Sequence, residues 1–382
     1  MAKPKAATGP PTRRPLNALF LLAFGCLAAL STYLMRVDTV LHEVPVNFHS
    51  VIESSTLENG TPVLTRYTGV RAVDEVARFL VAVFLAGTAR WDAGVHAQQA
   101  YFLTNWFAVV CVWTVESSRR RNAGRLVSFA ALFGLVYQII GAAIIAPLYY
   151  AAYVFASGGD AYHLHGREVP IATARALLPA VVLGYLVPTV ALYYGTWDLQ
   201  TVQYLTAFWQ PFPILVSALL SLFSFLTFSS SSASATAKNG DVKHLKRVYL
   251  LAGLVSAASH LSTLYLSLAS DNPQLALSYI FVPNRGSWKD SMVLGIHYIF
   301  QIDFIGAYVS TLFWTWLVTY DALRLQGKSS PSNLIQAALG IGFVTLVAGP
   351  GAAVVVVCNW REDRLVMIES GVKGNGKKSK AA

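Results

Sequence analysis

The chain has 382 residues, of which 55% are hydrophobic and only 13% are charged. Soluble globular proteins contain about 25% charged residues, so this composition excludes an ordinary soluble domain and predicts a polytopic membrane protein. The formal net charge of +10 is concentrated in the termini and short loops, which is typical of membrane topology and of contacts with anionic lipid. We therefore expect the lipid bilayer, and no nucleic acid, as the partner of the basic segments.

Apolar segments follow one another along the whole chain, separated by polar or basic stretches. A helix of about 20 residues crosses the hydrocarbon core of a bilayer, and most of the segments approach or exceed that length. The pattern predicts an all-α fold, namely a transmembrane bundle of about eight or nine helices. The candidate helices are residues 16–35, 73–89, 98–116, 126–156, 174–194, 211–228, 248–269, 292–320 and 334–357.

The segments between and beyond these helices suggest how the chain is organised. Residues 1–15 are basic and rich in proline, and we expect them to be disordered. The bundle should occupy residues 16–358, followed by a basic C-terminal tail at 359–382. The serine- and lysine-rich stretch 229–247 predicts an exposed linker between two halves of the bundle.

The segment 292–320 carries a carboxylate, Asp303, near its middle. A charged group at such a depth costs at least about 2.5 kcal/mol on insertion scales, so by default it indicates a function. At 100° per residue, Ser310 and Trp314 share a narrow arc with Asp303, and Asp321 joins them at the helix end.

A second polar arc on this helix holds His297, Gln301 and Tyr308. A helix with polar groups on two faces should not expose both to lipid. We therefore expect it to lie inside the bundle and to line a cavity.

Motifs for metal-dependent or cofactor-dependent chemistry are absent from the sequence. It contains no DDxxD or NDxxD motif, no P-loop, no GxGxxG, no HExxH and no CxxC. The three cysteines lie in apolar runs without metal-type spacing. We expect neither a bound metal nor a cofactor.

Isolated carboxylates and histidines remain, at membrane depth, among 9 Trp, 18 Tyr and 20 Phe. This combination suits proton-initiated carbocation chemistry. A buried, neutral carboxylic acid can protonate an alkene or an epoxide, and aromatic faces can stabilise the resulting cation. A proton-coupled transporter would use similar groups.

Four short motifs resemble those of fungal membrane-bound terpene cyclases, of the type found in macrophorin, ascofuranone and indole-diterpene pathways. The resemblance covers about residues 97 to 320. The motifs are Glu116-Ser-Ser-Arg-Arg-Arg-Asn122, Arg167-Glu-Val-Pro170 with Leu177-Leu-Pro-Ala180, Trp209-Gln-Pro-Phe-Pro213, and Gln301-Ile-Asp303.

The resemblance implies a compact helical bundle of the endoplasmic reticulum. Such a protein cyclises a hydrophobic prenyl chain, often epoxidised and attached to an aromatic or polyketide head, without a metal. It implies a role in secondary-metabolite biosynthesis, with contacts to other enzymes of the pathway. This chain departs from the smaller seven-helix meroterpenoid cyclases in its length and in its N-terminal helix and loop.

Asp303 and Glu116 are the candidate catalytic residues. We expect both to border one cavity, with one as proton donor and the other positioning substrate or supporting the donor. Each has a structural alternative. Asp303 could be bonded to a neighbouring helix, and Glu116, which precedes three arginines, could form an ion pair with them.

Further residues are candidates for substrate binding, again with structural alternatives. Asp198 could instead cap a helix, His260 could be a hydrogen-bonded core histidine, and the aromatic residues could serve packing or the membrane interface. The candidates are Asp198, His260, Trp113, Trp209, Gln301, Tyr308 and Trp314.

Three functions from different classes fit these features. The first is a metal-independent terpene cyclase. The second is a proton-coupled small-molecule transporter, which predicts internal repeats with matched broken helices; the sequence shows no such repeat. The third is a non-catalytic membrane scaffold for a biosynthetic complex, which would not need buried polar residues.

Overall fold

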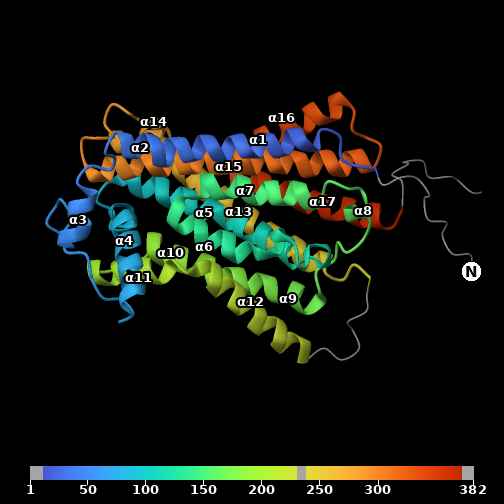
Figure 1. Ribbon diagram of the computed structural model, residues 1–382, viewed down its shortest axis with the longest axis horizontal. Helices are drawn as coiled ribbons and strands as arrows, with labels where there is room; N and C mark the ends of the chain where they lie inside the picture. Colours follow the sequence, from blue (N-terminus) through green and yellow to red (C-terminus); the bar gives the residue numbers. More distant parts are fainter. Residues whose placement is uncertain (1–11, 230–237, 372–382) are drawn as a thin grey trace, which may run out of the picture.

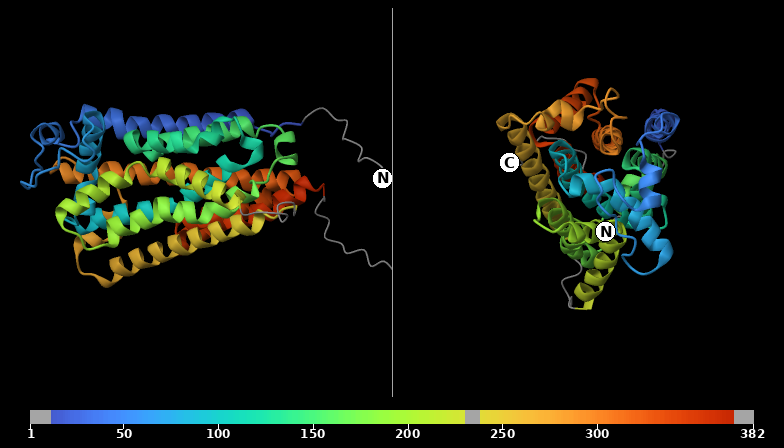
Figure 2. Two further views of the ribbon diagram at one scale, coloured as in Figure 1. Left: turned by 90° about the horizontal axis from the view of Figure 1, so that it is seen from below. Right: turned by 90° about the vertical axis from the view of Figure 1, so that its left-hand side faces the viewer.

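A computed structural model describes residues 12–229 and 238–371 of the chain (Figure 1). Apart from two isolated β-bridges, the described residues form helices, turns and loops, which confirms the predicted all-α fold. Most of the long helices run along the long axis of the molecule, whereas α4 (Arg71–Thr88) lies across it (Figure 1). Figure 2 shows the arrangement from below and from one end.

The helices follow one another in this order: α1 Asn17–Thr32, η1 Tyr33–Val37, α2 Asp38–Leu41, α3 Phe48–Ser54, α4 Arg71–Thr88, α5 Ala93–Ser118, η2 Arg120–Asn122, η3 Leu126–Phe129, α6 Ala130–Ile140, α7 Ala142–Ala156, α8 Ala161–Leu164, α9 Ile171–Val181, η4 Val182–Leu186, α10 Val187–Tyr194, α11 Leu199–Trp209, α12 Phe212–Ser229, α13 Val242–Ala269, η5 Pro273–Leu275, α14 Leu277–Phe281, α15 Met292–Leu325, α16 Pro331–Ala348 and α17 Pro350–Glu369.

Helix α5 is the centre of the bundle. From Gln98 to Glu116 every residue is buried, which is the pattern of a helix packed on all sides. Helices α4, α13, α15 and α17 all pack against it. On the outside of this core, α1, α7 and α15 lie side by side (Figure 1).

In the part of the chain that the structure describes, five helical stretches are long and apolar enough to cross a membrane, or six if the bent pair α11 and α12 counts as one span. The five are Asn17–Leu41, Ile171–Tyr194, Val242–Ala269, Met292–Leu325 and Pro331–Ala348. Eight or nine crossings would also require α4, α5, α6 and α7. These helices fall outside the set because they are either too polar or too short.

Two glycines break segments that we expected to be continuous. Gly141, with φ +99°, separates α6 from α7, and Gly349, with φ +88°, separates α16 from α17. Positive φ angles of this kind favour glycine because it lacks a Cβ atom. A Cβ at Gly141 would also lie only 2.5 Å from the Cε of Met35. The expected single helices over 126–156 and 334–357 are therefore wrong.

The predicted start of the C-terminal tail is wrong, because the second half of α17 occupies its first residues. We expected a tail from residue 359, but α17 continues to Glu369 and buries both Arg361 and Glu362. Glu362 pairs with Arg119 at the end of α5, and Arg361 pairs with Glu116 at 2.8 Å. These ion pairs hold the polar end of α17 inside the bundle. Residues 372–382 lie outside the described part of the chain.

The prediction of a disordered N-terminus is wrong for residues 12–15. Arg14 is buried, and its guanidinium donates to both carboxylate oxygens of Asp321, at 2.8 and 2.6 Å. Two parallel hydrogen bonds of this kind are the strongest geometry for an arginine–carboxylate pair. They tie residues 12–15 to the end of α15. Residues 1–11 lie outside the described range.

The predicted linker at 229–247 also includes residues that belong to the helical bundle. Residues 230–237 are outside the described residues, and α13 begins at Val242. Asp241 is buried and binds the guanidinium of Arg167 at 3.1 Å. The C-terminal part of the expected linker therefore packs against the bundle, because its aspartate neutralises a buried arginine.

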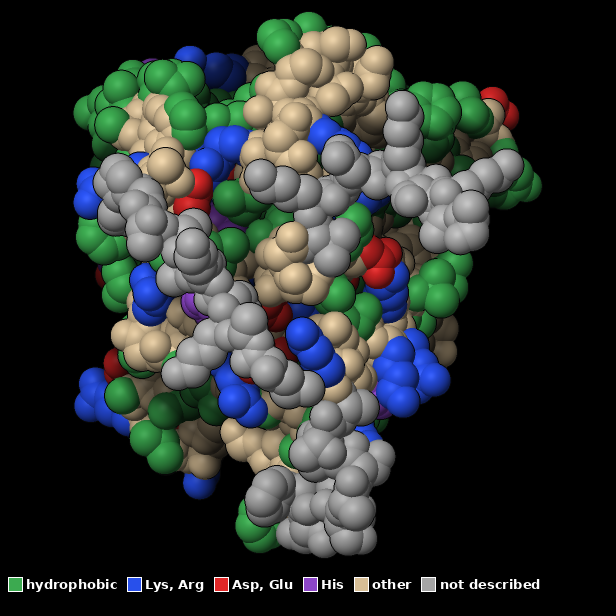
Figure 3. Space-filling view, turned by 90° about the vertical axis from the view of Figure 1, so that its right-hand side faces the viewer, with side chains coloured by type: hydrophobic (Ala, Val, Ile, Leu, Met, Phe, Trp, Pro, Cys, Tyr) green, Lys and Arg blue, Asp and Glu red, His purple; other side chains and the backbone are tan. Residues whose placement is uncertain are grey.

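Basic side chains gather at the end of the bundle near α8 and the C-terminal part of α17 (Figure 3). Arg120 and Arg125 are exposed in this region. Such a distribution is typical of a surface in contact with lipid head groups.

The buried ion pairs lead to a test of stability. Glu362→Gln removes a buried carboxylate that pairs with Arg119 and Arg167, and breaking a buried pair on one side costs about 3–5 kcal/mol. We expect thermal unfolding of the purified variant at a clearly lower temperature. The neighbouring Asp363→Asn, which loses only an exposed pair with Lys246, should unfold close to wild type. Equal shifts in both variants would contradict the assignment.

Candidate active site

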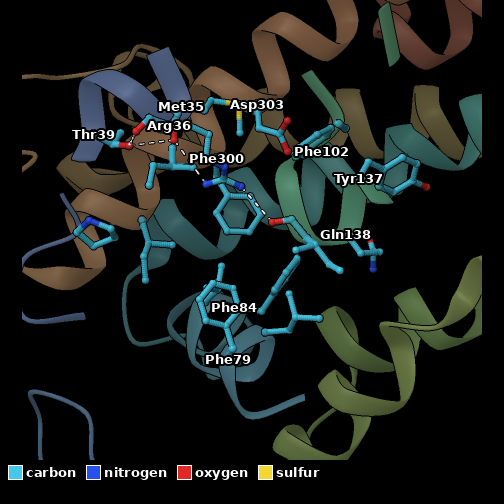
Figure 4. A pocket seen from close by; sticks show the side chains of 18 of the residues that line it. Met35, Arg36, Thr39, Phe79, Phe84, Phe102, Tyr137, Gln138, Phe300 and Asp303 are labelled. Atoms are coloured by element: carbon cyan, nitrogen blue, oxygen red, sulfur yellow. Dashed lines mark hydrogen bonds between the residues drawn. The ribbon is translucent and has the colours of Figure 1, made fainter. Parts of the chain in front are cut away.

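An apolar pocket of about 250 Å³ lies between the first helical stretch, α4, α5, α6 and α15 (Figure 4). Aromatic rings make up much of its wall. Ligand pockets are typically lined in this way, with few polar groups. The aromatic lining residues are Phe48, Phe79, Phe84, Phe102, Trp106, Tyr137, Trp209 and Phe300.

Asp303 is the sole carboxyl group among the described residues that line this pocket. Its Oδ1 accepts a hydrogen bond from the backbone N–H of Ala143 at 2.6 Å. Helix α7 begins at Ala142, so the side chain sits where the first amides of a helix lack partners and where the helix dipole is positive. Asp303 therefore caps α7 from a different helix while it borders the pocket.

Arg36 lies on the opposite side of the same helix break. It belongs to the π-helical turn η1, and its Nη2 donates to the carbonyl of Ile139 in the last turn of α6 at 3.1 Å. A cation at a helix C-terminus complements the dipole. Gly141 thus has a basic side chain at the end of α6 and an acidic one at the start of α7.

The polar atoms of the largest rings are bonded within the protein. Trp106 donates its indole N–H to the hydroxyl of Tyr137 at 3.1 Å, and Trp209 donates to the Thr189 hydroxyl at 2.9 Å. These bonds orient the rings and leave their carbon surfaces for the pocket wall. The wall is therefore largely apolar, and its polar character comes from a few residues near Asp303.

Of the predicted site residues, Asp303 and Trp209 line this pocket. Tyr308 packs behind the wall, with its ring 5.7 Å from that of Trp106. Trp113 and Trp314 stack on tyrosines of α7 elsewhere in the core.

The structure separates Glu116 from the pocket. Its carboxylate pairs with Arg119 and Arg361, and Arg361 also donates to the Tyr153 hydroxyl. Tyr153 is ten residues beyond Ala143 on α7, a distance of about 15 Å along a helix. Glu116 is not among the residues that line the pocket, so the prediction of one cavity bordered by both carboxylates is wrong. The ion-pair alternative describes its contacts.

Two other candidates have contacts that match their structural alternatives. His260 has both ring nitrogens occupied, by the Tyr101 hydroxyl at 2.8 Å and the Leu346 carbonyl at 3.1 Å. Asp198 accepts hydrogen bonds from the hydroxyl and the amide of Thr201 as the N-cap of α11. The Thr201 hydroxyl and amide hold the pKa of Asp198 below its ordinary value, which favours the charged form.

Gln301 lies on another face of α15. Its side-chain amide donates to the carbonyl of Tyr279 at 2.7 Å, and it borders a separate depression that it shares with His297. Asp303 reaches the aromatic pocket, whereas Gln301 and His297 of the second predicted arc both contact the carbonyl of Tyr279.

Several lining residues escaped the sequence analysis, among them Arg36, Gln138 and Trp106. A partial signal exists for Phe300, which precedes Asp303 by one helical turn, and for Arg36, which directly follows the first apolar run. The other missed lining residues, such as Gln138 and Trp106, lie on helices whose packing partners cannot be read from the neighbouring sequence. Within residues 12–229 and 238–371, no group of three or more His, Cys, Asp or Glu side chains is arranged to hold a metal ion.

Comparisons with known proteins agree with this architecture. The CtvD domain model matches residues 18–367. The chain is 25% identical to terpene cyclase ascI of Acremonium egyptiacum over 328 residues, covering 82% of this chain and 84% of that protein. It is 24% identical to terpene cyclase DEP1 of Alternaria brassicicola over 370 residues, covering 90% and 98%.

A third relative is larger. FAD-dependent monooxygenase BOA8 of Botryotinia fuckeliana is 26% identical over 266 residues, which are 68% of this chain and 33% of that protein. The chain therefore spans about one third of that relative's length. No solved structure matches. Because the domain model covers nearly the whole bundle, the chain belongs to the CtvD-domain family of fungal membrane terpene cyclases.

Proposed function

We propose that this protein is a metal-independent cyclase that protonates an alkene or an epoxide of a prenyl chain and guides the carbocation through ring closure. The observation that carries the proposal is the position of Asp303, the single carboxyl group among the described residues of a pocket lined mainly by aromatic and aliphatic side chains. Family membership supports the reaction class.

The contacts of Asp303 suit a proton donor that must become an anion during the reaction. The protonated carboxyl transfers its proton either to a terminal alkene carbon or to an epoxide oxygen. In the alkene, the C=C electron pair forms the new C–H bond and the other carbon becomes the carbocation. In the epoxide, the C–O bond breaks, its electron pair stays on the oxygen as a hydroxyl group, and the carbon becomes the carbocation. The carboxylate that forms is already faced by the Ala143 amide at the start of α7. The Ala143 N–H is a hydrogen-bond donor that is already in place before the reaction, so it stabilises the developing negative charge of the carboxylate without reorganisation of the protein.

The aromatic wall suits the positive charge that travels along the chain. Ring faces attract cations through their quadrupole, and the wall carries rings from several helices, among them Phe84, Phe102 and Trp209. Loss of a proton from the last cation ends the sequence, so the product is an isomer of the substrate. The small number of polar lining groups also limits capture of the cation by water.

The setting of the reaction follows from the resemblance and the relatives. We place the enzyme in the endoplasmic reticulum membrane, in the biosynthesis of meroterpenoid secondary metabolites. The alignment with part of an FAD-dependent monooxygenase supports contact with an oxygenating enzyme of the same pathway, because such an enzyme can supply an epoxide.

Replacement of Asp303 tests the donor. Asp303→Asn keeps the side-chain oxygen that accepts from Ala143 but removes the transferable proton, so the fold should persist and cyclisation should fall by about 10³-fold or more. Products are measured in microsomes fed plain and epoxidised prenylated arenes.

Asp198→Asn is the matched control for this variant, because asparagine caps a helix as well as aspartate does and Asp198 is exposed outside the pocket. It should cyclise at the wild-type rate. Near wild-type turnover by Asp303→Asn, with membrane insertion unchanged, would show that the proton donor is another residue.

Chelation tests the initiation mechanism. Acid initiation needs no ionisation of a diphosphate, so the same microsomes treated with EDTA should retain their activity. Loss of activity that magnesium restores would instead indicate metal-assisted loss of diphosphate.

A further inference from the structure

Arg36 is half-buried and has no ion pair within 4 Å among the described residues. Arg14, Arg119 and Arg361, by contrast, each pair with at least one carboxylate oxygen within 2.8 Å. The guanidinium of Arg36 donates to two backbone carbonyls, those of Met35 at 3.5 Å and Ile139 at 3.1 Å.

This arginine lines the same pocket as Asp303 (Figure 4). A guanidinium has five N–H donors in a planar fork that matches a carboxylate, and two bonds leave most of that capacity unused. The half-buried cation interacts electrostatically with Asp303. When Asp303 is protonated, as the proposed function requires, Arg36 needs another partner to compensate its lost hydration. The ligand that fits the pocket should therefore bring an anionic oxygen to Arg36.

Polar lining groups are close to Arg36 in the chain or on the neighbouring helix. Thr39 is one turn away, and its hydroxyl is held by the Met35 carbonyl at 2.9 Å. Gln138 precedes Ile139, the residue whose carbonyl binds Arg36, and its amide is fixed by Gln210. The opposite part of the wall carries Phe79 and Phe84 (Figure 4). The pocket thus has a polar side and an aromatic side.

From this arrangement, and resting on the proposed cyclase function, we propose that Arg36 binds an acidic head group of the substrate. The substrate class is then a prenylated arene that carries a carboxylate. The head lies against Arg36, Thr39 and Gln138, and the prenyl chain follows the aromatic side and folds back so that its reacting double bond or epoxide meets Asp303. Arg36 is a specificity residue in this assignment and takes no part in proton transfer.

Binding without turnover tests the assignment. The probes are 3-farnesyl-4-hydroxybenzoic acid and its methyl ester, which differ in charge but share the chain and the ring. Binding to the purified full-length protein is followed by quenching of tryptophan fluorescence, because Trp106 and Trp209 line the pocket. Hydrogen bonds to charged groups contribute about 1.5–3 kcal/mol, so wild type should prefer the acid by about tenfold or more.

The variants separate charge recognition from structural support. Arg36→Gln should lose the preference for the acid and bind the ester with unchanged affinity, whereas Arg36→Lys should keep part of the preference. Arg71→Gln, at an exposed arginine paired only with Glu75, should behave as wild type. Equal affinity of wild type for acid and ester would overturn the assignment. Equal weakening of both ligands by Arg36→Gln would also overturn it, because Arg36 would then act only by stabilising the C-terminal turn of α6.

Two further measurements identify the source of the anion and keep this inference separate from the proposed function. Oleate carries a carboxylate without an arene. If it displaces the farnesylated acid with equal affinity, Arg36 binds any anionic lipid and the assignment to a substrate head is overturned. If the acid preference depends on Arg36 but an epoxidised acid is never cyclised, the head-group site stands and the cyclase function fails.

Discussion

The hydrogen bond between Asp303 and the start of α7 is the contact on which the pocket depends. Gly141 allows the chain to turn between α6 and α7, but a helix that starts inside a bundle leaves its first amides without partners. Asp303 supplies the acceptor from α15, and Arg36 supplies a donor for the end of α6. The side chains of Asp303 and Arg36 would be costly among lipid tails. The helix break at Gly141 gives both of them hydrogen-bond partners and places both at the wall of the pocket.

Buried charge has a different role at the other end of the bundle. Glu116, Arg119, Arg361 and Glu362 neutralise one another, and Arg14 pairs with Asp321. Apart from the pair of Glu116 with Arg119, each pair joins segments far apart in the sequence, so these pairs determine how α5, α15, α17 and the N-terminal segment are arranged. Fully paired charges hold elements together, whereas a charge with incomplete pairing at a cavity remains free to interact with a ligand.

This division explains how one helix can support both structure and chemistry. Helix α15 contributes Asp303 to the pocket, Gln301 to the Tyr279 carbonyl of α14 and Asp321 to the N-terminal contact. Gln301 lies at another angle around the helix, whereas Asp321 shares the arc of Asp303 but lies about five turns further along it. A long helix inside a bundle can therefore serve several sites.

Some of these features depend on local sequence alone. The apolar composition and the length of the hydrophobic runs were sufficient to indicate an all-α membrane protein, because a bilayer requires every backbone group to be bonded within the helix. The same reasoning identified Asp303 as unusual, since a carboxylate in a long apolar run needs an explanation wherever it packs.

Other features depended on tertiary contacts. Glu116 stands before three arginines in the sequence, but Arg361, which also neutralises it, lies 245 residues away, whereas Asp303 caps a helix that begins at Ala142. Gly141 and Gly349 look like ordinary helix residues in apolar runs until their positive φ angles appear in the fold. Arg36 has only a partial local signal, its place directly after the first apolar run. The chain alone determined which residues prefer helices and lipid, and only packing decided which polar groups found partners, because those partners lie on distant segments.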